Sequence, residues 1–538
     1  MRRLMVLLGS RAACGAALML VALGAGSVAG QSVPAAKPVS GGTLTVAYVP
    51  AATHIDVNAA NIATLNEVAH YFHETLFDRD AKGKLVPLLV KDEQVSADGL
   101  TITWKLQPGV KFHDGTPFNA AAVKWNLDRK IQKKQPLFDM LPLKTVVAAD
   151  ELTVRVSLTR PAPSLNAFLS DKTFSMYSPT FAEKVGDDGL KQQASGTGPF
   201  SVAEFRPNAY LRLKKNLDYW QKGLPYLDEV VFKVVPDINA RATMLLARDA
   251  DMALALSAAD MQRLAETKGF QVLQQMGSHQ YYITINTRRP ALNDVRVRQA
   301  LNHAVDKDGI SKAVFLGKAV AATAPYINST VDGYVNVGTY RYDPERAKQL
   351  LDEAGWKVGS SGIREKDGKP LRLELITRKG SVPGDYETAE LVQGMLNAVG
   401  VDSKLVVLES ATFISRVTKP VEQADYDLMS FSINIFVGDA EYVMRTFFHT
   451  DSFAPRYYNR AYYSNLQVDR WIEESLRAAR RSDRDRIYAR VIEQVFRDAP
   501  IIMLCDVFQM AAVTDKVHGV YLTGPQNNWP AKFAWKEK

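Results

Sequence analysis

The chain has 538 residues, of which 46% are hydrophobic and 23% are charged, and its formal net charge is +8. This composition is typical of a globular protein, and the chain is too long for one hydrophobic core, so we expect two or three domains. Basic and acidic residues are interspersed, as in RAARRSDRDR at 477–486, and no basic block is interleaved with aromatics, which argues against a nucleic-acid-binding protein.

The first 29 residues have the features of a secretory signal. A basic pair, Arg2 and Arg3, precedes apolar runs within 4–25, and small residues at 27–29 fit the small-x-small cleavage pattern. A transmembrane anchor is the alternative, but the longer run is rich in Ala and Gly and falls short of about 20 strongly apolar residues. We therefore predict a cleavable signal peptide at 1–29, with the Sec and Tat export routes both left open.

The predicted mature chain begins with a Pro/Ala/Ser/Gly linker at 30–39 and carries a formal charge of +5, because the signal removes three arginines. Cys14 lies in a poor acylation context inside the signal, so Cys505 is the only cysteine left and no intramolecular disulfide is expected. No later apolar run is long enough to span a membrane. These features predict a protein that is exported to a periplasm, and we expect it to be a monomer.

Apolar periodicity predicts the elements of the mature chain. In chain order they are a strand at 42–49, a helix at 66–77, two strands within 100–115, a helix at 119–131 capped by Asn119 or Thr116, strands at 151–158, 227–237 and 280–287, helices at 294–315 and 343–355, and strands at 371–377, 402–408 and 426–433. The pattern changes near residue 285 from strand-rich to a regular alternation of strands and helices. We take this change as the main domain boundary and predict an α/β fold.

Motifs for catalysis or metal binding are incomplete. VGSSG at 358–362 lacks the spacing of a nucleophile elbow, and neither a phosphate-binding loop nor a dinucleotide fingerprint occurs. His70 and His73 have a metal-like spacing without a second cluster. His113 and Asp114 adjoin a glycine turn, where Asp-Gly is favoured for backbone reasons. We predict no catalytic residues, no metal site and no cofactor.

Seven motifs in a fixed order carry a family resemblance. They are HETLFDRDAKGKLVPLLVKDEQVSADGLTITWKLQPGVKFHDGTPFNAAAV with GTGPF after it, LKKNLDYWQKGLPYLDEVVFKVVPD, NDVRVRQALNHAVDKDGI, YDPERAKQLLDEAGW, DYDLMSF and RDAPIIML. This series resembles the family 5 extracellular solute-binding proteins, the peptide, nickel and opine receptors of ABC importers. The resemblance covers nearly the whole mature chain.

The resemblance implies a two-lobed α/β fold of the type II periplasmic-binding-protein class, with an extra inserted subdomain and a ligand cleft between the lobes. Lobe I would comprise 40–79, 197–284 and 506–538, with the inserted subdomain at 80–196, and lobe II would comprise 285–505. Chain crossings near 283–287 and near Cys505 would form the hinge on which the lobes close around a solute.

The same resemblance gives candidate ligand-binding residues by position. They are Thr53, His54, Asp56, Tyr71, His73, Thr197, Arg378, Asn434, Phe436, Asp439 and Tyr442. Dipeptide receptors of the family typically carry a tryptophan and an aspartate where this chain has Ile433 and Phe436, and that aspartate pairs with the peptide amine. Loss of a charge-assisted bond costs about 1.5–3 kcal/mol, so a free-amine dipeptide would need another anchor, for which Asp439 or Glu441 are candidates.

We therefore predict a non-enzymatic periplasmic receptor that captures a peptide or peptide-like solute and delivers it to the transmembrane subunits and ATPases of an ABC permease. Opines, glycosides and nickel chelates are alternatives within the family. A secreted α/β hydrolase and a surface adhesion module are the alternatives from other classes.

Overall fold

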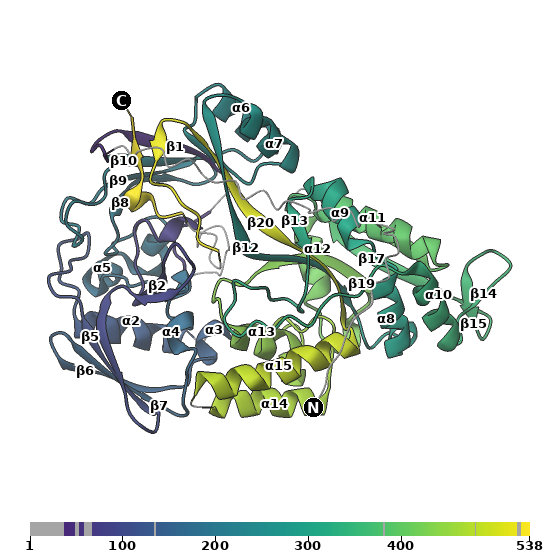
Figure 1. The fold of residues 1–538 in the computed structure, drawn as a ribbon. Coiled ribbons are helices and arrows are strands. Elements are labelled where there is room, and N and C mark those ends of the chain that lie inside the picture. The colour runs from purple at the N-terminus through teal and green to yellow at the C-terminus, as the bar shows by residue number, and fades with distance from the viewer. Residues whose placement is uncertain are drawn as a thin grey trace, which may run out of the picture. The chain divides into compact units, whose positions relative to one another are not determined.

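A mixed eleven-stranded sheet organises the described residues, which are 37–48, 53–58, 67–133, 136–379, 382–478, 480–524 and 529–537 of a computed structural model. Its strand order is β18-β17-β19-β12-β20-β11-β1-β10-β9-β8, and β13 pairs with β20. Two long strands, β12 (Phe270–Ile285) and β20 (Ile501–Thr514), pair with each other and run from one half of the sheet into the other (Figure 1). These strands divide the fold into two lobes. The predicted signal at 1–29 lies outside the described residues.

The first lobe contains one half of this sheet. Its strands and covering helices are β1 (Thr43–Tyr48), β8 (Phe200–Arg206), β9 (Tyr210–Lys215), β10 (Glu229–Val234), β11 (Met252–Leu254), α6 (Ile238–Leu246) and α7 (Ala258–Glu266). Strand β1 pairs in parallel with β10 and β11. Leu44 and Val46 enter one hydrophobic core and Ala47 enters another, because successive side chains of a strand point to opposite faces.

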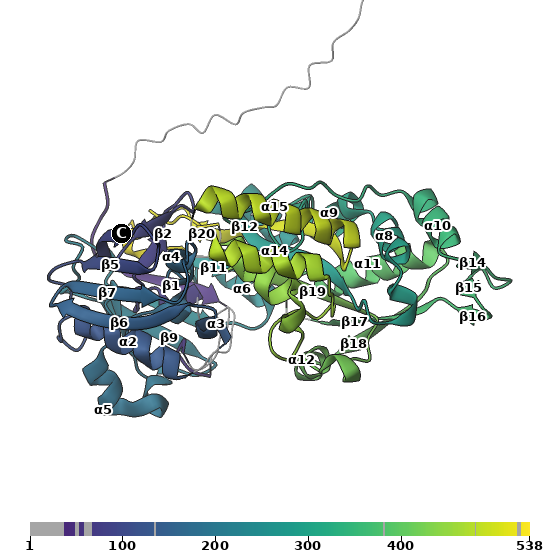
Figure 2. The ribbon, with the colours of Figure 1, turned by 90° about the horizontal axis from the view of Figure 1, so that it is seen from below.

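The second lobe contains the other half of the sheet, covered by helices on both faces. Its strands are β13 (Ala319–Ala321), β17 (Arg372–Arg378), β18 (Asp402–Leu408) and β19 (Leu428–Asn434). One face packs on α8 (Val295–His303), α9 (Lys307–Phe315), α10 (Pro344–Glu353) and α11 (Asp385–Ala398). The other packs on α12 (Ser410–Val417), α13 (Ala440–Val443), the π-helix Met444–Phe448, α14 (Leu466–Arg477) and α15 (Arg481–Asp498). Helices α14 and α15 lie side by side (Figures 1 and 2).

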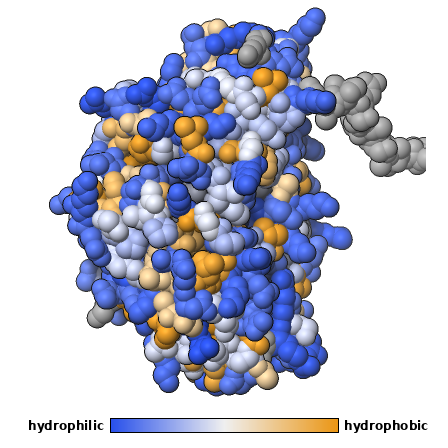
Figure 3. Space-filling view, turned by 90° about the vertical axis from the view of Figure 1, so that its left-hand side faces the viewer, coloured by the Kyte–Doolittle hydropathy of each residue, from blue (hydrophilic) through white to orange (hydrophobic). Residues whose placement is uncertain are grey.

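A separate sheet with the order β4-β5-β7-β6 forms what we call the β4–β7 unit. Its elements are β4 (Val90–Val95), β5 (Thr101–Leu106), β6 (Leu143–Asp150), β7 (Thr153–Leu158), α2 (Ala120–Gln132), α3 (Pro136–Asp139), α4 (Leu165–Phe168) and α5 (Pro179–Leu190). The fully buried Trp104 lies in its core, which also takes in Phe77 of β2 (Phe77–Arg79). On the face shown in Figure 3, hydrophobic residues occur in small groups among hydrophilic ones, as on an ordinary solvent-facing surface.

Short strands and 3-10 turns complete the described structure. The strands are β3 (Leu85–Pro87), which pairs with β2, β14 (Lys357–Val358), β15 (Arg364–Lys366), β16 (Lys369–Pro370), β21 (Val517–His518) and β22 (Trp535–Lys536). The 3-10 turns are Lys172–Phe174, Pro290–Leu292, Val421–Gln423, Thr450–Ser452 and Ala531–Phe533.

Most expected elements are confirmed within a few residues. Helix α2 begins after Asn119, whose side chain accepts a hydrogen bond from the Ala122 amide, and α10 has Asp343 as its N-cap. The helix expected at 66–77 is wrong, because described helical structure ends at Ala69 and a turn leads into β2. The helix expected at 294–315 is two helices, since α8 ends at His303 and Asp306 caps α9.

Candidate functional site

The two strands that link the lobes change register where one lobe gives way to the other. The pairing of β12 with β20 shifts between Met276 and Gln280, and Gln280 lies opposite Asp506. The Gln280 side-chain amide donates a hydrogen bond of 2.8 Å to Asp506. Burial raises the pKa of Asp506 to about 7, and the bond from Gln280 opposes this rise. A register break in a paired strand locally bends and twists it, so this level is a structural candidate for the hinge.

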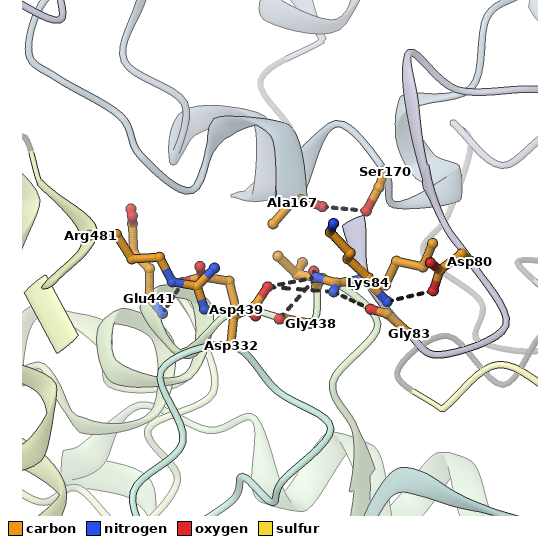
Figure 4. A network of polar contacts seen from close by, with 12 residues as sticks. Asp80, Gly83, Lys84, Ala167, Ser170, Asp332, Gly438, Asp439, Glu441 and Arg481 are labelled. Carbon is orange, nitrogen blue, oxygen red and sulfur yellow. Dashed lines mark hydrogen bonds and ion pairs between the residues drawn. The ribbon is translucent and has the colours of Figure 1, made fainter. Parts of the chain in front are cut away.

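Arg79, at the end of β2, connects the β4–β7 unit to the second lobe. Its guanidinium donates to the carbonyls of Val437 and Gly438, at 3.2 and 3.0 Å, and lies 3.4 Å from Asp332. It also donates to the carbonyl of Gly83, at 2.9 Å. Figure 4 shows Asp332 and Gly438 on one side of this network and Gly83 on the other. The Arg79 side chain is 2% exposed, so this polar bridge is shielded from water.

Glu441 of α13 forms a second connection between the same two bodies. It accepts a hydrogen bond from Ser164 and lies 3.5 Å from Arg160, both in the β4–β7 unit. Arg445, one helical turn further on, pairs with Glu441 at 3.1 Å and donates to the Met140 carbonyl at 2.9 Å. The Glu441 carboxylate is therefore already compensated by protein groups.

Asp439 is engaged in the same way inside the second lobe. It caps α13 by accepting from the Glu441 amide at 2.9 Å, and it pairs with Arg484 of α15 at 2.9 Å. Burial raises the pKa of Asp439 to about 6 in spite of the opposing charge of Arg484. Asp439 and Glu441, the two carboxylates considered as anchors for a peptide amine, both have protein partners.

Arg378 and Asn434 lie at the carboxyl ends of β17 and β19, which is the edge where α/β folds bind ligands. The Arg378 guanidinium lies 4.8 Å from the ring centre of Phe431 and 3.4 Å from Asp385. Burial raises the pKa of Asp385 to about 6, and the charge of Arg378 opposes this rise. Asn434 pairs across to His279 of β12, and its side-chain oxygen is buried without a hydrogen-bond partner among the described residues.

Phe436 and Tyr442 belong to the segment that follows β19. Phe436 is half-buried, and Tyr442 packs against the cores of both the second lobe and the β4–β7 unit. The structure therefore brings Arg378, Asn434, Phe436, Asp439 and Tyr442 into one region of the second lobe, beside β12.

Three other candidates are buried within the first lobe and its contacts with the β4–β7 unit. The Tyr71 hydroxyl donates to the Trp529 carbonyl at 2.7 Å, and Asp56 accepts from the Tyr177 hydroxyl at 2.9 Å. One ring nitrogen of His73 lies 3.2 Å from a backbone carbonyl, and burial lowers the pKa of His73 to about 3. These contacts give all three side chains a structural role.

Thr197, Thr53 and His54 complete the predicted set. The buried Thr197 donates to Glu74 at 3.0 Å, and Glu74 also accepts from the Tyr219 hydroxyl at 2.7 Å. Thr53 is exposed and His54 is half-buried. No hydrogen bond or ion pair between described residues links Thr197, Thr53 or His54 to Arg378 or Asn434. The predicted residues thus form two groups, one in each lobe.

The described residues contain no cluster of three or more His, Cys, Asp or Glu side chains arranged to hold a metal ion. None of the described helices has the length and apolar character needed to cross a lipid bilayer.

Two lobes joined by two continuous strands, with candidate residues at the strand ends, define the class of two-lobed solute-binding proteins with the type II fold. Residues 84–455 match the family described as bacterial extracellular solute-binding proteins, family 5 Middle. The chain belongs to this family.

Similar proteins cover almost the whole chain. The glutathione-binding protein GsiB of Pectobacterium atrosepticum is 31% identical over 476 residues, which is 87% of this chain and 90% of that protein. NikA from Brucella suis, solved with Fe(III)-EDTA, has a TM-score of 0.82 and 25% identity over 92% of this chain and all of its own. AppA from Bacillus subtilis, solved with a nonapeptide, has a TM-score of 0.79 and 24% identity over 93% of this chain and all of its own, which supports the fold.

The structure also identifies residues that the sequence did not single out. Arg79 lies at the end of β2, and Arg460 lies in a loop. Neither belongs to a catalytic or metal-binding sequence motif. Their roles depend on contacts with residues far away in the chain, such as Arg79 with Gly438 and Arg460 with Phe431. A sequence pattern does not report such contacts.

Proposed function

We propose that this protein is the periplasmic receptor of an ABC importer and that its solute is a peptide of the glutathione type. The observation that carries the proposal is the 31% identity to a glutathione-binding protein over 87% of the chain. The receptor would close its lobes on the solute through bending of β12 and β20 and then deliver it to the permease.

The charges of the second lobe support a solute recognised through its carboxylates. Asp439 and Glu441 are compensated by Arg484 and by Arg160 and Arg445, so neither offers an unpaired negative charge to a peptide amine. Arg378 lies at the carboxyl end of β17 and is half-buried. Glutathione carries two carboxylates, whereas a simple dipeptide carries one.

Calorimetric titration and thermal melting of the mature, ligand-free protein test this proposal. Reduced glutathione, pooled di- to pentapeptides, a nickel–histidine chelate, an opine and a glycoside are the probes. A ligand at 100 times its dissociation constant adds about 2.7 kcal/mol to the stability of the native state, so binding raises the melting temperature measurably. We expect stabilisation by glutathione and 1:1 binding. Binding of the nickel chelate, an opine or a glycoside, with no response to any peptide, would contradict the peptide assignment.

We further propose that residues 1–29 are removed on export and that the mature protein acts as a monomer. Amino-terminal sequencing of the protein recovered from a periplasmic extract, together with its mass by light scattering, checks both points. A secreted hydrolase would instead consume glutathione or a peptide during prolonged incubation, which chromatography of the mixture would reveal.

A further inference from the structure

Arg460 differs from the other buried arginines of the described chain. The six buried arginines are Arg79, Arg241, Arg298, Arg364, Arg460 and Arg484. Each of the other five donates a side-chain hydrogen bond to a carboxylate or carbonyl oxygen. Within the described residues, no oxygen atom accepts a hydrogen bond from the Arg460 guanidinium, and this absence is what distinguishes it, since a buried Nε atom without a partner also occurs in Arg79, Arg241 and Arg484.

The surroundings of Arg460 are aromatic. Its guanidinium lies 5.1 Å from the ring centre of Phe431 and 5.6 Å from that of Tyr458. The residue is only 9% exposed. Stacking on aromatic faces holds a guanidinium in place, but it does not supply the anion that a buried charge requires. Protein folding alone gives no reason to keep this charge here.

Phe431 also holds the second arginine of this region. Arg378 lies 4.8 Å from the same ring centre, so two guanidinium groups share one aromatic side chain. Asp385 compensates Arg378 through a contact of 3.4 Å. No carboxylate within the described residues is paired with Arg460. Phe431 lies opposite Tyr282 of β12, so the pair of arginines adjoins a strand that links the lobes.

From this arrangement we infer that Arg460 binds a carboxylate group of the solute, with Arg378 as the neighbouring cation. The planar fork of a guanidinium matches the two oxygens of a carboxylate, and such charge-assisted bonds are stronger than neutral ones. Phe431 and Tyr458 orient the guanidinium before the solute arrives. This inference rests on the proposed function, because it is the peptide-like solute that supplies the carboxylate.

Matched ligands and matched variants test the inference. The mature wild-type protein, Arg460→Gln and Arg460→Lys are titrated with reduced glutathione and with its diethyl ester, and with trialanine and its carboxyl-terminal amide. Arg456→Gln is the control, since Arg456 belongs to the same loop, is exposed, and lies over the ring of Tyr457. We expect the wild type and Arg456→Gln to prefer the free acid by about tenfold or more, which corresponds to one charge-assisted bond.

Arg460→Gln should lose this preference, and Arg460→Lys should keep part of it. Without ligand, Arg460→Gln should melt at the wild-type temperature or above it, because it removes a buried charge that has no anion. A lower melting temperature with the acid preference intact would overturn the inference and make Arg460 a structural residue.

The remaining outcomes separate the inference from the proposed function. Equal wild-type affinity for acids and their esters or amides overturns the inference while the peptide function stands. If peptides do not bind but an opine-type carboxylate does, and Arg460→Gln abolishes that binding, the inference stands and the peptide function falls. Failure of every carboxylate probe to bind overturns both.

Discussion

Asp439 shows how one side chain can be committed to structure although its position in the sequence suggests ligand binding. It follows β19 at the edge where α/β folds bind ligands, and its carboxylate both caps α13 and pairs with Arg484. Nothing in the local sequence VGDAEYV shows that an arginine 45 residues further along takes this charge. The turn could be predicted from Gly438-Asp439, but the ion pair could not, because it depends on how α15 packs.

Replacement of Asp439 by asparagine tests the importance of this pair. Asparagine keeps an oxygen that can cap α13 but leaves the buried Arg484 without an opposite charge, and breaking a buried pair in this way costs about 3–5 kcal/mol. The raised folded-state pKa of Asp439, about 6, favours a neutral side chain here by about 3 kcal/mol at pH 8 and offsets most of this loss. We therefore expect a net loss of about 1–2 kcal/mol in the free energy of unfolding, measured with urea at pH 8. The control is Asp483→Asn, because Asp483 pairs with the largely exposed Arg480 and Arg486, and should cost about 1 kcal/mol or less. Equal losses in both variants would contradict this account.

At the scale of elements, local patterns predict short strands and capped helices well, but they predict the full extent of long strands poorly. The strand expected at 280–287 is only the second half of β12, because the first half contains Gly277 and several polar residues that break the alternation. The helix expected at 66–77 is wrong because a helical spacing of apolar residues continues there beyond the end of the helix. Tyr71, Phe72 and Leu76 are buried, but they are buried by tertiary contacts of an irregular segment and not along one helical face.

Strand β20 leads to a prediction about pH. The folded-state pKa of Asp506 is raised by burial to about 7 from its ordinary value of 3.8, so the protonated form is favoured in the folded protein. Its contribution to stability is complete below about pH 4 and is lost as the pH rises through about 7, and each pKa unit corresponds to about 1.4 kcal/mol. Asp506→Asn should therefore melt at a higher temperature than the wild type at pH 8, with a smaller difference at pH 5.

Melting curves of both proteins across this pH range provide the measurement. Asp515→Asn is the control, because Asp515 lies just after β20, is about half exposed, and pairs with Arg248 at the surface. If Asp506→Asn and Asp515→Asn show the same dependence on pH as the wild type, the raised pKa of Asp506 is wrong.

For the whole molecule, the order of seven sequence motifs predicted the family and the two-lobed class, because these motifs lie at turns, caps and strand ends that the fold requires. The lobe boundaries remain a prediction. The contacts that hold the second lobe against the β4–β7 unit were not predictable, since Arg79 meets Asp332 and Gly438 across more than 250 residues of sequence. Val437, from the second lobe, lies in the core of the β4–β7 unit, so this contact is apolar as well as polar.

The Arg79 bridge gives a prediction for the molecule as a whole. Arg79→Gln removes its bonds to Asp332, Val437 and Gly438, so conformations in which the second lobe rests on the β4–β7 unit should be less populated. On the proposed function, those conformations enclose the solute, so the apparent dissociation constant should rise in inverse proportion to their population. We expect a larger radius of gyration in solution scattering of the ligand-free variant and weaker glutathione binding.

Arg481→Gln is the matched control, because Arg481 pairs with the same Asp332, at 2.8 Å, but belongs to the second lobe and spans no boundary between bodies. Gly438→Ala changes the second-lobe partner of the same bridge. A Cβ atom there would lie 2.5 Å from the Arg79 guanidinium, and φ at Gly438 is +68°, so the alanine must displace the bridge. Arg79→Gln and Gly438→Ala should therefore resemble each other and differ from Arg481→Gln. If all three match the wild type in radius and affinity, the bridge does not control how the lobes close.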